Sequence, residues 1–117
     1  MLGAVLRVAG TRPPDKAIRT GLAAGLPREV ADRIVADFTP ESARLYRDAA
    51  GSRALPAHRG YVHTSADREI SPAAQQASAR RLDAGWTRTL PTGHLPMLEA
   101  PVLLAGAVGD FLAAGPG

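Results

Sequence analysis

The 117-residue sequence contains no cysteine, which excludes a disulfide, a cysteine nucleophile and a thiolate metal site. Aromatic residues make up only 4% of the chain, so any core has to be built from Ala, Leu, Val and Ile. The remaining composition, with 45% hydrophobic and 21% charged residues, is typical of a globular protein and not of a disordered or fibrous one. The length allows one domain at most.

Long hydrophobic runs are also lacking. The run over residues 102–114 is interrupted by Asp110 and by glycines, and it falls short of the ~20 apolar residues that a membrane span needs. Near the N-terminus, Arg7 follows the apolar residues instead of preceding them, which does not fit a signal peptide. We therefore expect a soluble, cytoplasmic protein without a membrane partner.

The sequence has no run of like charge, although its net charge is +3. The basic residues are scattered singly among acids, and Arg80-Arg81 is the one adjacent pair. Because nucleic-acid binders cluster their basic residues, we expect no nucleic-acid partner. The three histidines, His58, His63 and His94, have no close spacing, so we expect no metal site and no cofactor.

The first half of the chain predicts helices separated by Pro and Gly. Helices are expected over residues 15–24, 28–38 and 40–50, followed by a loop over 52–58. In the second of these, Val30, Ile34, Val35 and Phe38 recur at helical spacing. Thr39 is the expected N-cap of the third.

The second half predicts an alternation of strands and helices. Strands are expected over 61–64 and 86–90, loops over 65–71 and 91–96, and helices over 72–83 and from Pro101 through Leu112. Ser71 and Pro72 provide an N-cap and a first helical position. A helical crossover of this length favours a right-handed unit with parallel strands. Two such strands leave open edges, so we expect part of a larger α/β sheet or a chain that needs a partner.

Two side chains in the loops after the strands are candidates for chemistry. Asp67 follows the first strand and His94 the second. Because the carboxyl ends of parallel strands meet at one edge of a sheet, the two side chains can converge there. A carboxylate beside an imidazole is the arrangement of a general base for a hydroxyl nucleophile. Glu69 is a competing carboxylate in the same loop, and Asp67 or His94 alone also fits a structural role.

Two segments resemble the last third of an α/β-hydrolase-fold protein. GYVHTSADREISP, residues 60–72, resembles the penultimate strand and acid loop of that family, and LPTGHLPMLEAP, residues 90–101, resembles its histidine loop and the start of its final helix. The nearest likeness is to the methylesterase and hydroxynitrile-lyase branch, including bacterial esterases. The resemblance implies a helical cap-like segment over 1–58 and the C-terminal β-α-β-α part of a partial α/β-hydrolase fold over 59–117.

By this resemblance, Asp67 is the acid and His94 the base of a catalytic triad, and the substrate is a small ester-like molecule. The sequence contains no G-x-S-x-G nucleophile motif and no HGGG-type oxyanion motif, and the earlier strands have no counterpart. We therefore expect a truncated hydrolase that is inactive toward esters on its own. The alternative is a non-catalytic small-ligand or protein-interaction module, with self-association through the open sheet edges.

Overall fold

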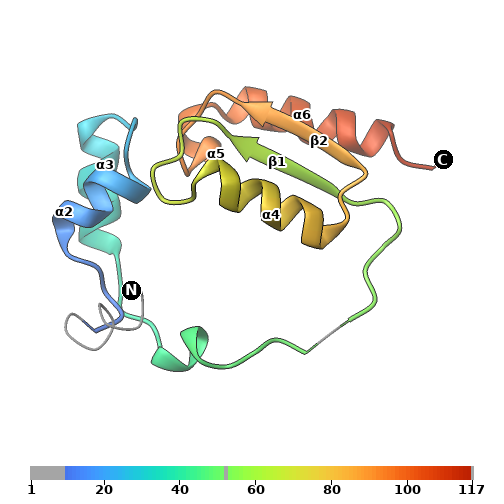
Figure 1. Cartoon of the computed structure of the whole chain (residues 1–117). Helices are drawn as coiled ribbons and strands as arrows, with labels where there is room; N and C mark the ends of the chain where they lie inside the picture. Colours follow the sequence, from blue (N-terminus) through green and yellow to red (C-terminus); the bar gives the residue numbers. More distant parts are fainter. Residues whose placement is uncertain (1–9, 52, 117) are drawn as a thin grey trace.

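The structure, a computed structural model, describes residues 10–51 and 53–116 and has a mixed α/β architecture (Figure 1). Its first half contains the helical elements α2 (Asp15–Ala17), the π-helical turn η1 (Ile18–Leu22), α3 (Arg28–Asp37) and the 3-10 turn η2 (Ala43–Tyr46). Its second half contains β1 (Gly60–Thr64), α4 (Pro72–Leu82), β2 (Trp86–Leu90), α5 (Pro96–Glu99) and α6 (Pro101–Ala113). No helix in the described part of the chain is long and apolar enough to cross a membrane.

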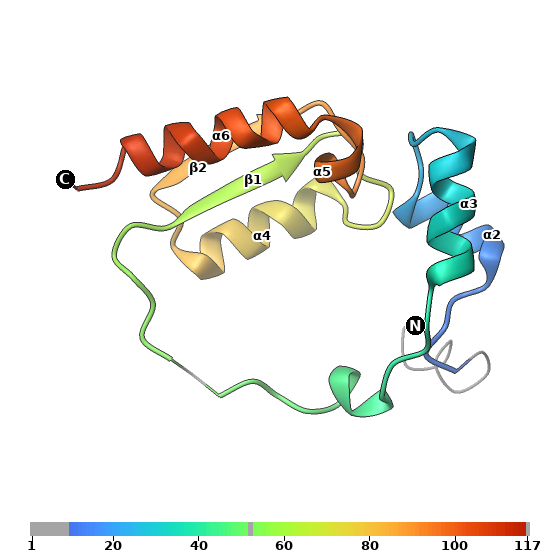
Figure 2. The ribbon, with the colours of Figure 1, turned by 180° about the vertical axis from the view of Figure 1, so that it is seen from behind.

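The two strands form a parallel pair, as the sequence predicts. Gly60 lies opposite Trp86, and Thr64 lies opposite Leu90. The crossover helix α4 begins where expected, because the Ser71 hydroxyl accepts a hydrogen bond from the Ala74 N–H. The two views place α4 on one face of the sheet and α6 on the other (Figures 1 and 2). Within the described residues, the sheet has two strands and therefore two open edges.

The helix α6 covers the sheet with only one of its sides. Phe111 packs edge-on against Trp86, with ring centroids 5.5 Å apart, and Ala107 is buried beside them. The opposite side of this apolar helix faces solvent, with Val102 83% exposed and Leu112 68% exposed. A helix that is hydrophobic all round is normally covered all round, so α6 presents an apolar surface that the described residues do not cover.

The elements α2, η1 and α3, residues 15–37, form what we call the helical unit. Its small core includes Ile18, Ala23 and Val35, all buried. Arg12 closes the C-terminal end of α3 by donating to the carbonyl oxygens of Val35, at 2.9 Å, and Phe38, at 3.2 Å. The unit lies beyond the ends of both strand arrows (Figures 1 and 2). It therefore sits at the carboxyl edge of the sheet, where Asp67 and His94 are expected.

The predicted helix over residues 40–50 is wrong. Only the single turn η2 forms there, and its cap is Ser42, whose hydroxyl accepts from the Arg44 N–H, and not Thr39. Every described residue from 39 to 57 is exposed, including Leu45 at 65%. A helix of about ten residues is marginal unless its apolar side packs against something. Leu45 and Tyr46 are both exposed, so the pattern alone does not hold a helix.

Smaller differences concern the ends of elements. The expected loop over 91–96 gives way at Pro96 to the short helix α5, which starts with proline at its first position. The helix α4 ends at Leu82, one residue before the end of the predicted helix over 72–83, because Asp83 takes the left-handed conformation, with φ at 52°. The strand predictions are confirmed. The part of the predicted cap-like segment over residues 1–9 lies outside the described residues.

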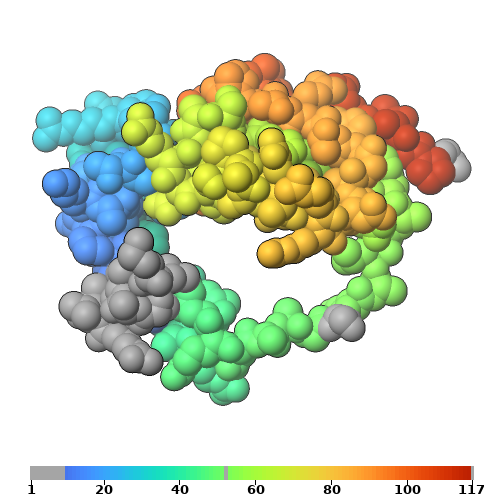
Figure 3. All heavy atoms as spheres, viewed as in Figure 1, coloured from blue at the N-terminus to red at the C-terminus, as the bar shows by residue number. Residues whose placement is uncertain are grey.

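The chain is more open than a monomer of its size. Its accessible surface is 8454 Å² at a mass of 12.2 kDa, whereas about 6,100 Å² is typical of that mass. Its radius of gyration is 16.2 Å, against about 13 Å for a compact domain of this length. In the space-filling view, the connection that contains η2 runs below α4 across an open gap (Figure 3). The fold thus leaves much surface without a neighbour, including apolar side chains of α6 such as Val102 and Leu112.

Candidate acid–base site at the ends of the two strands

The structure brings Asp67 and His94 together. The Nδ1 atom of His94 lies 3.0 Å from Oδ2 of Asp67. The two loops that carry them are joined by backbone hydrogen bonds, from Ser65 N–H to the Leu90 oxygen and from Ala66 N–H to the Thr92 oxygen, both at 3.0 Å. The convergence therefore follows directly from the parallel register of β1 and β2.

The Asp67 carboxylate is held by four donors. Its Oδ1 accepts from the backbone N–H groups of Glu69 and Ile70, at 2.8 and 3.0 Å, while its Oδ2 accepts from the Thr64 hydroxyl, at 2.9 Å, and from His94. The side chain is only 4% exposed. Burial raises the pKa of Asp67, but the hydrogen bonds from Ile70, His94, Glu69 and Thr64 outweigh it and lower this pKa from 3.8 to about 2. Asp67 is therefore ionised at neutral pH.

This ionised partner fixes the tautomer of neutral His94. A carboxylate only accepts hydrogen bonds, so Nδ1 of His94 must carry the proton that it donates to Asp67. The lone pair of the neutral ring then lies on Nε2, the atom that can take up a proton. The His94 side chain is 27% exposed, so the ring remains accessible. The pair has the arrangement of a carboxylate-supported general base.

A pocket of ≈ 260 Å³ adjoins the pair. Besides Asp67 and His94, its lining includes the apolar side chains Val62, Met97 and Leu104. These side chains come from β1, α5 and α6, so the pocket is built by the same elements that position the two loops. An apolar group bound there would lie beside the imidazole.

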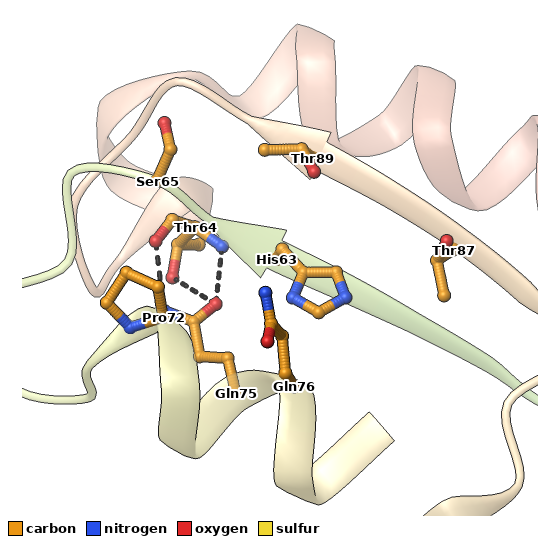
Figure 4. Close-up of a pocket in the computed structure, with 8 residues that line it drawn as sticks. All are labelled: His63, Thr64, Ser65, Pro72, Gln75, Gln76, Thr87 and Thr89. Carbon is orange, nitrogen blue, oxygen red and sulfur yellow. Dashed lines mark hydrogen bonds between the residues drawn. The ribbon is translucent and has the colours of Figure 1, made fainter. Parts of the chain in front are cut away.

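Gln75 was not singled out from the sequence, but it holds the end of β1. Its amide accepts from the Thr64 N–H at 2.8 Å and donates to the Thr64 carbonyl oxygen at 3.0 Å (Figure 4). The same amide nitrogen donates to the Ile70 carbonyl oxygen, at 2.9 Å, in the acid loop. Gln75 is 3% exposed. Its only signal in the sequence is a polar residue on the first turn after the Ser71 cap, which does not distinguish it from its neighbour Gln76.

The competing carboxylate Glu69 does not take the place of Asp67. Its backbone N–H serves the Asp67 carboxylate, while its own carboxylate packs against Gly21 of the helical unit. Ser65 is also engaged elsewhere, because its hydroxyl donates to the Leu90 carbonyl oxygen at 3.3 Å. Asp67 is thus the acid that meets His94 in this arrangement.

The other two histidines lie away from the pair. His58 stacks on Phe111 with ring centroids 4.0 Å apart, and its Nε2 donates to the Phe111 carbonyl oxygen at 2.7 Å. It therefore closes the C-terminal end of α6. His63 lines a separate pocket of ≈ 310 Å³ together with Thr87 and Thr89 (Figure 4).

Metal ligation finds no support in the described part of the chain. The structure there contains no group of three or more His, Asp or Glu side chains placed to hold an ion. No protein-family model, no curated protein and no solved structure matches this chain.

Proposed function

We propose that the chain carries the acid and the base of an α/β-hydrolase-type site for ester substrates. The observation that carries this proposal is the 3.0 Å contact between His94 Nδ1 and Asp67 Oδ2 at the carboxyl ends of two parallel strands. The low pKa of Asp67, about 2, supports it. Catalytic groups of open α/β sheets lie at this edge of the sheet.

In the proposed reaction, Nε2 of His94 takes the proton of a hydroxyl group as its oxygen attacks the ester carbonyl. The resulting imidazolium is stabilised by the ionised Asp67 and later returns the proton to the leaving alcohol. This sequence contains neither the G-x-S-x-G nucleophile motif nor the HGGG-type oxyanion motif. Loss of the nucleophile costs on the order of 10⁶ in turnover, so the 117-residue chain is expected to be inert alone.

The free edge of β1 is the place for a completing strand. Ser65 N–H bonds to β2, so by alternation the N–H and C=O groups of Val62 and Thr64 point away from it. The Gln75 amide pairs with the N–H and C=O groups of Thr64, and no described residue pairs with the N–H and C=O groups of Val62. Val62 also lines the pocket beside His94. A polypeptide that added a strand here would be well placed to bring a hydroxyl group to the imidazole.

The test is proton NMR of the whole chain. A hydrogen bond from Nδ1 of His94 to a carboxylate gives a far-downfield imidazole proton signal. We expect this signal in the parent chain and in Glu69→Gln, and its loss in Asp67→Asn. Absence of the signal from the parent chain, or its survival in Asp67→Asn, contradicts the proposal. Hydrolysis of p-nitrophenyl acetate should be no faster for the parent chain than for His94→Ala.

A second candidate function is a non-catalytic interaction module, favoured by the exposed apolar side of α6. Val102 and Leu112 are 83% and 68% exposed there, and such surfaces commonly mark protein contacts. If this side joins copies of the chain, sedimentation should show an oligomer that Val102→Lys together with Leu112→Lys converts to a monomer. A parent chain that is monomeric at high concentration contradicts this candidate.

A further inference from the structure

Glu99 holds the loop that carries His94, residues 91–95, through a contact separate from that of Asp67. Its Oε2 accepts a hydrogen bond of 2.7 Å from the backbone N–H of Gly93, the residue directly before His94. Hydrogen bonds to a carboxylate are shorter and about twice as strong as neutral ones. The backbone that leads into His94 is therefore fixed by a charged side chain of α5.

The helical unit approaches the same point. A methyl group at position 93 would lie 2.7 Å from the carbonyl oxygen of Ala24 and 3.3 Å from Oε2 of Glu99. The Glu99 carboxylate also borders the turn at Gly25, where an added methyl group would lie 3.6 Å from Oε1. Glycine is thus required at position 93 because the Ala24 carbonyl group and the Glu99 carboxylate converge there.

The loop that carries Asp67, residues 65–71, also contacts the helical unit. A methyl group on Gly21, a buried residue of η1, would overlap the Glu69 carboxylate. Since Glu69 N–H is one of the donors to Asp67, the helical unit contacts the loops of both members of the pair. Its docking can therefore influence how Asp67 and His94 face each other.

We infer that Glu99 is a positioning residue for His94, and that it links the docking of the helical unit to the orientation of the imidazole. The inference rests on the proposed function, in which His94 is the base. Asp67 has three anchors besides His94, whereas the His94 ring has the one described hydrogen bond, to Asp67. The direction of the ring consequently depends on the backbone that Glu99 holds.

The experiment compares Glu99→Ala, Glu99→Gln and the control Glu29→Ala, an exposed glutamate in the first turn of α3. Two NMR signals of the full chain are followed: hydrogen exchange of the Gly93 amide and the downfield Nδ1 proton of His94. For Glu99→Ala we expect Gly93 exchange to be at least about tenfold faster, as loss of a hydrogen bond to a charged group implies. We also expect the imidazole signal to broaden or disappear. Glu99→Gln should restore part of both effects, because its amide oxygen still accepts, and Glu29→Ala should change neither.

The outcomes separate this inference from the proposed function. If the parent chain lacks the imidazole signal, the proposed pair fails. If the signal is present and survives in Glu99→Ala while the Gly93 amide exchanges faster, the positioning role of Glu99 is overturned. Gly21→Ala tests the link to the helical unit through a different contact. It should accelerate Gly93 exchange, and unchanged exchange in a variant with the parent's circular dichroism overturns that link.

Discussion

Replacement of Asp67 by Asn is expected to destabilise the chain by about 2 kcal/mol at neutral pH. The free energy follows from the pKa of Asp67, which the fold lowers from 3.8 to about 2, because one pKa unit corresponds to about 1.4 kcal/mol. Asn keeps the shape of the side chain but, like protonated Asp, lacks the charge. The side chain is only 4% exposed, so solvent screening removes little of this effect.

The stability of the chain depends on pH through the same lowered pKa of Asp67. A lowered pKa means that the folded state favours the carboxylate, so the stabilisation is fully present above about pH 4 and is lost as the pH falls toward 2. Urea unfolding at pH 7 and near pH 2 measures it, with Trp86 as reporter. This is the one tryptophan of the chain, and it packs against Phe111.

The matched control is Asp48→Asn, which removes an exposed ion pair with Arg44 and should change stability by about 0.5 kcal/mol or less. The difference between the parent chain and Asp67→Asn should be large at pH 7 and small near pH 2. Equal stability at pH 7, or a difference that persists unchanged in acid, would refute the assignment of the Asp67 hydrogen bonds as the source of the stabilisation.

Two further substitutions test how the site is built, both by urea unfolding. Gln75→Ala should lose about 2 kcal/mol because it leaves half-buried backbone groups of Thr64, at the end of β1, unpaired. Replacement of the exposed Gln76 by Ala should change stability by about 0.5 kcal/mol or less, and equal effects of the two substitutions would contradict the role of Gln75. Gly60→Ala should cost about 1–3 kcal/mol, because a methyl group there would lie 2.8 Å from the Phe111 ring. Gly51→Ala, with nothing within 4 Å of its added methyl group, should be neutral, and a neutral Gly60→Ala would contradict the packing of α6 on the strand.

The sequence predicts the parallel pair and the meeting of Asp67 with His94 because these depend on local signals. The β-rich residues 61–64, the alternation over 86–90, the Ser71-Pro72 helix start and the polar loops are each signals that lie within a few residues. Once the strands are parallel and joined by α4, the carboxyl-edge geometry follows without knowledge of other contacts. These signals can be recognised in the sequence because each one involves only a few neighbouring residues.

The rest of the site depends on how the elements pack against one another in three dimensions, and local sequence patterns do not carry that information. Gln75 and Gln76 are indistinguishable in sequence, yet one is buried against Thr64 and the other is exposed. The helix expected over 40–50 fails for the same reason, since its apolar residues find no surface to pack on. Glu99 gains its role only because α5 forms and approaches Gly93.

The connection between Phe38 and Gly60, whose described residues from 39 to 57 are all exposed, joins the helical unit to the sheet covalently. Two binding surfaces that a short connection joins in this way meet at an effective concentration that is typically about millimolar. A protease that cut this connection would remove that advantage. At micromolar protein, the two pieces would then remain together only if the contacts at Gly21 and Gly93 give them a dissociation constant in the micromolar range or lower. Limited digestion followed by gel filtration therefore measures the intrinsic affinity between the two parts of the molecule.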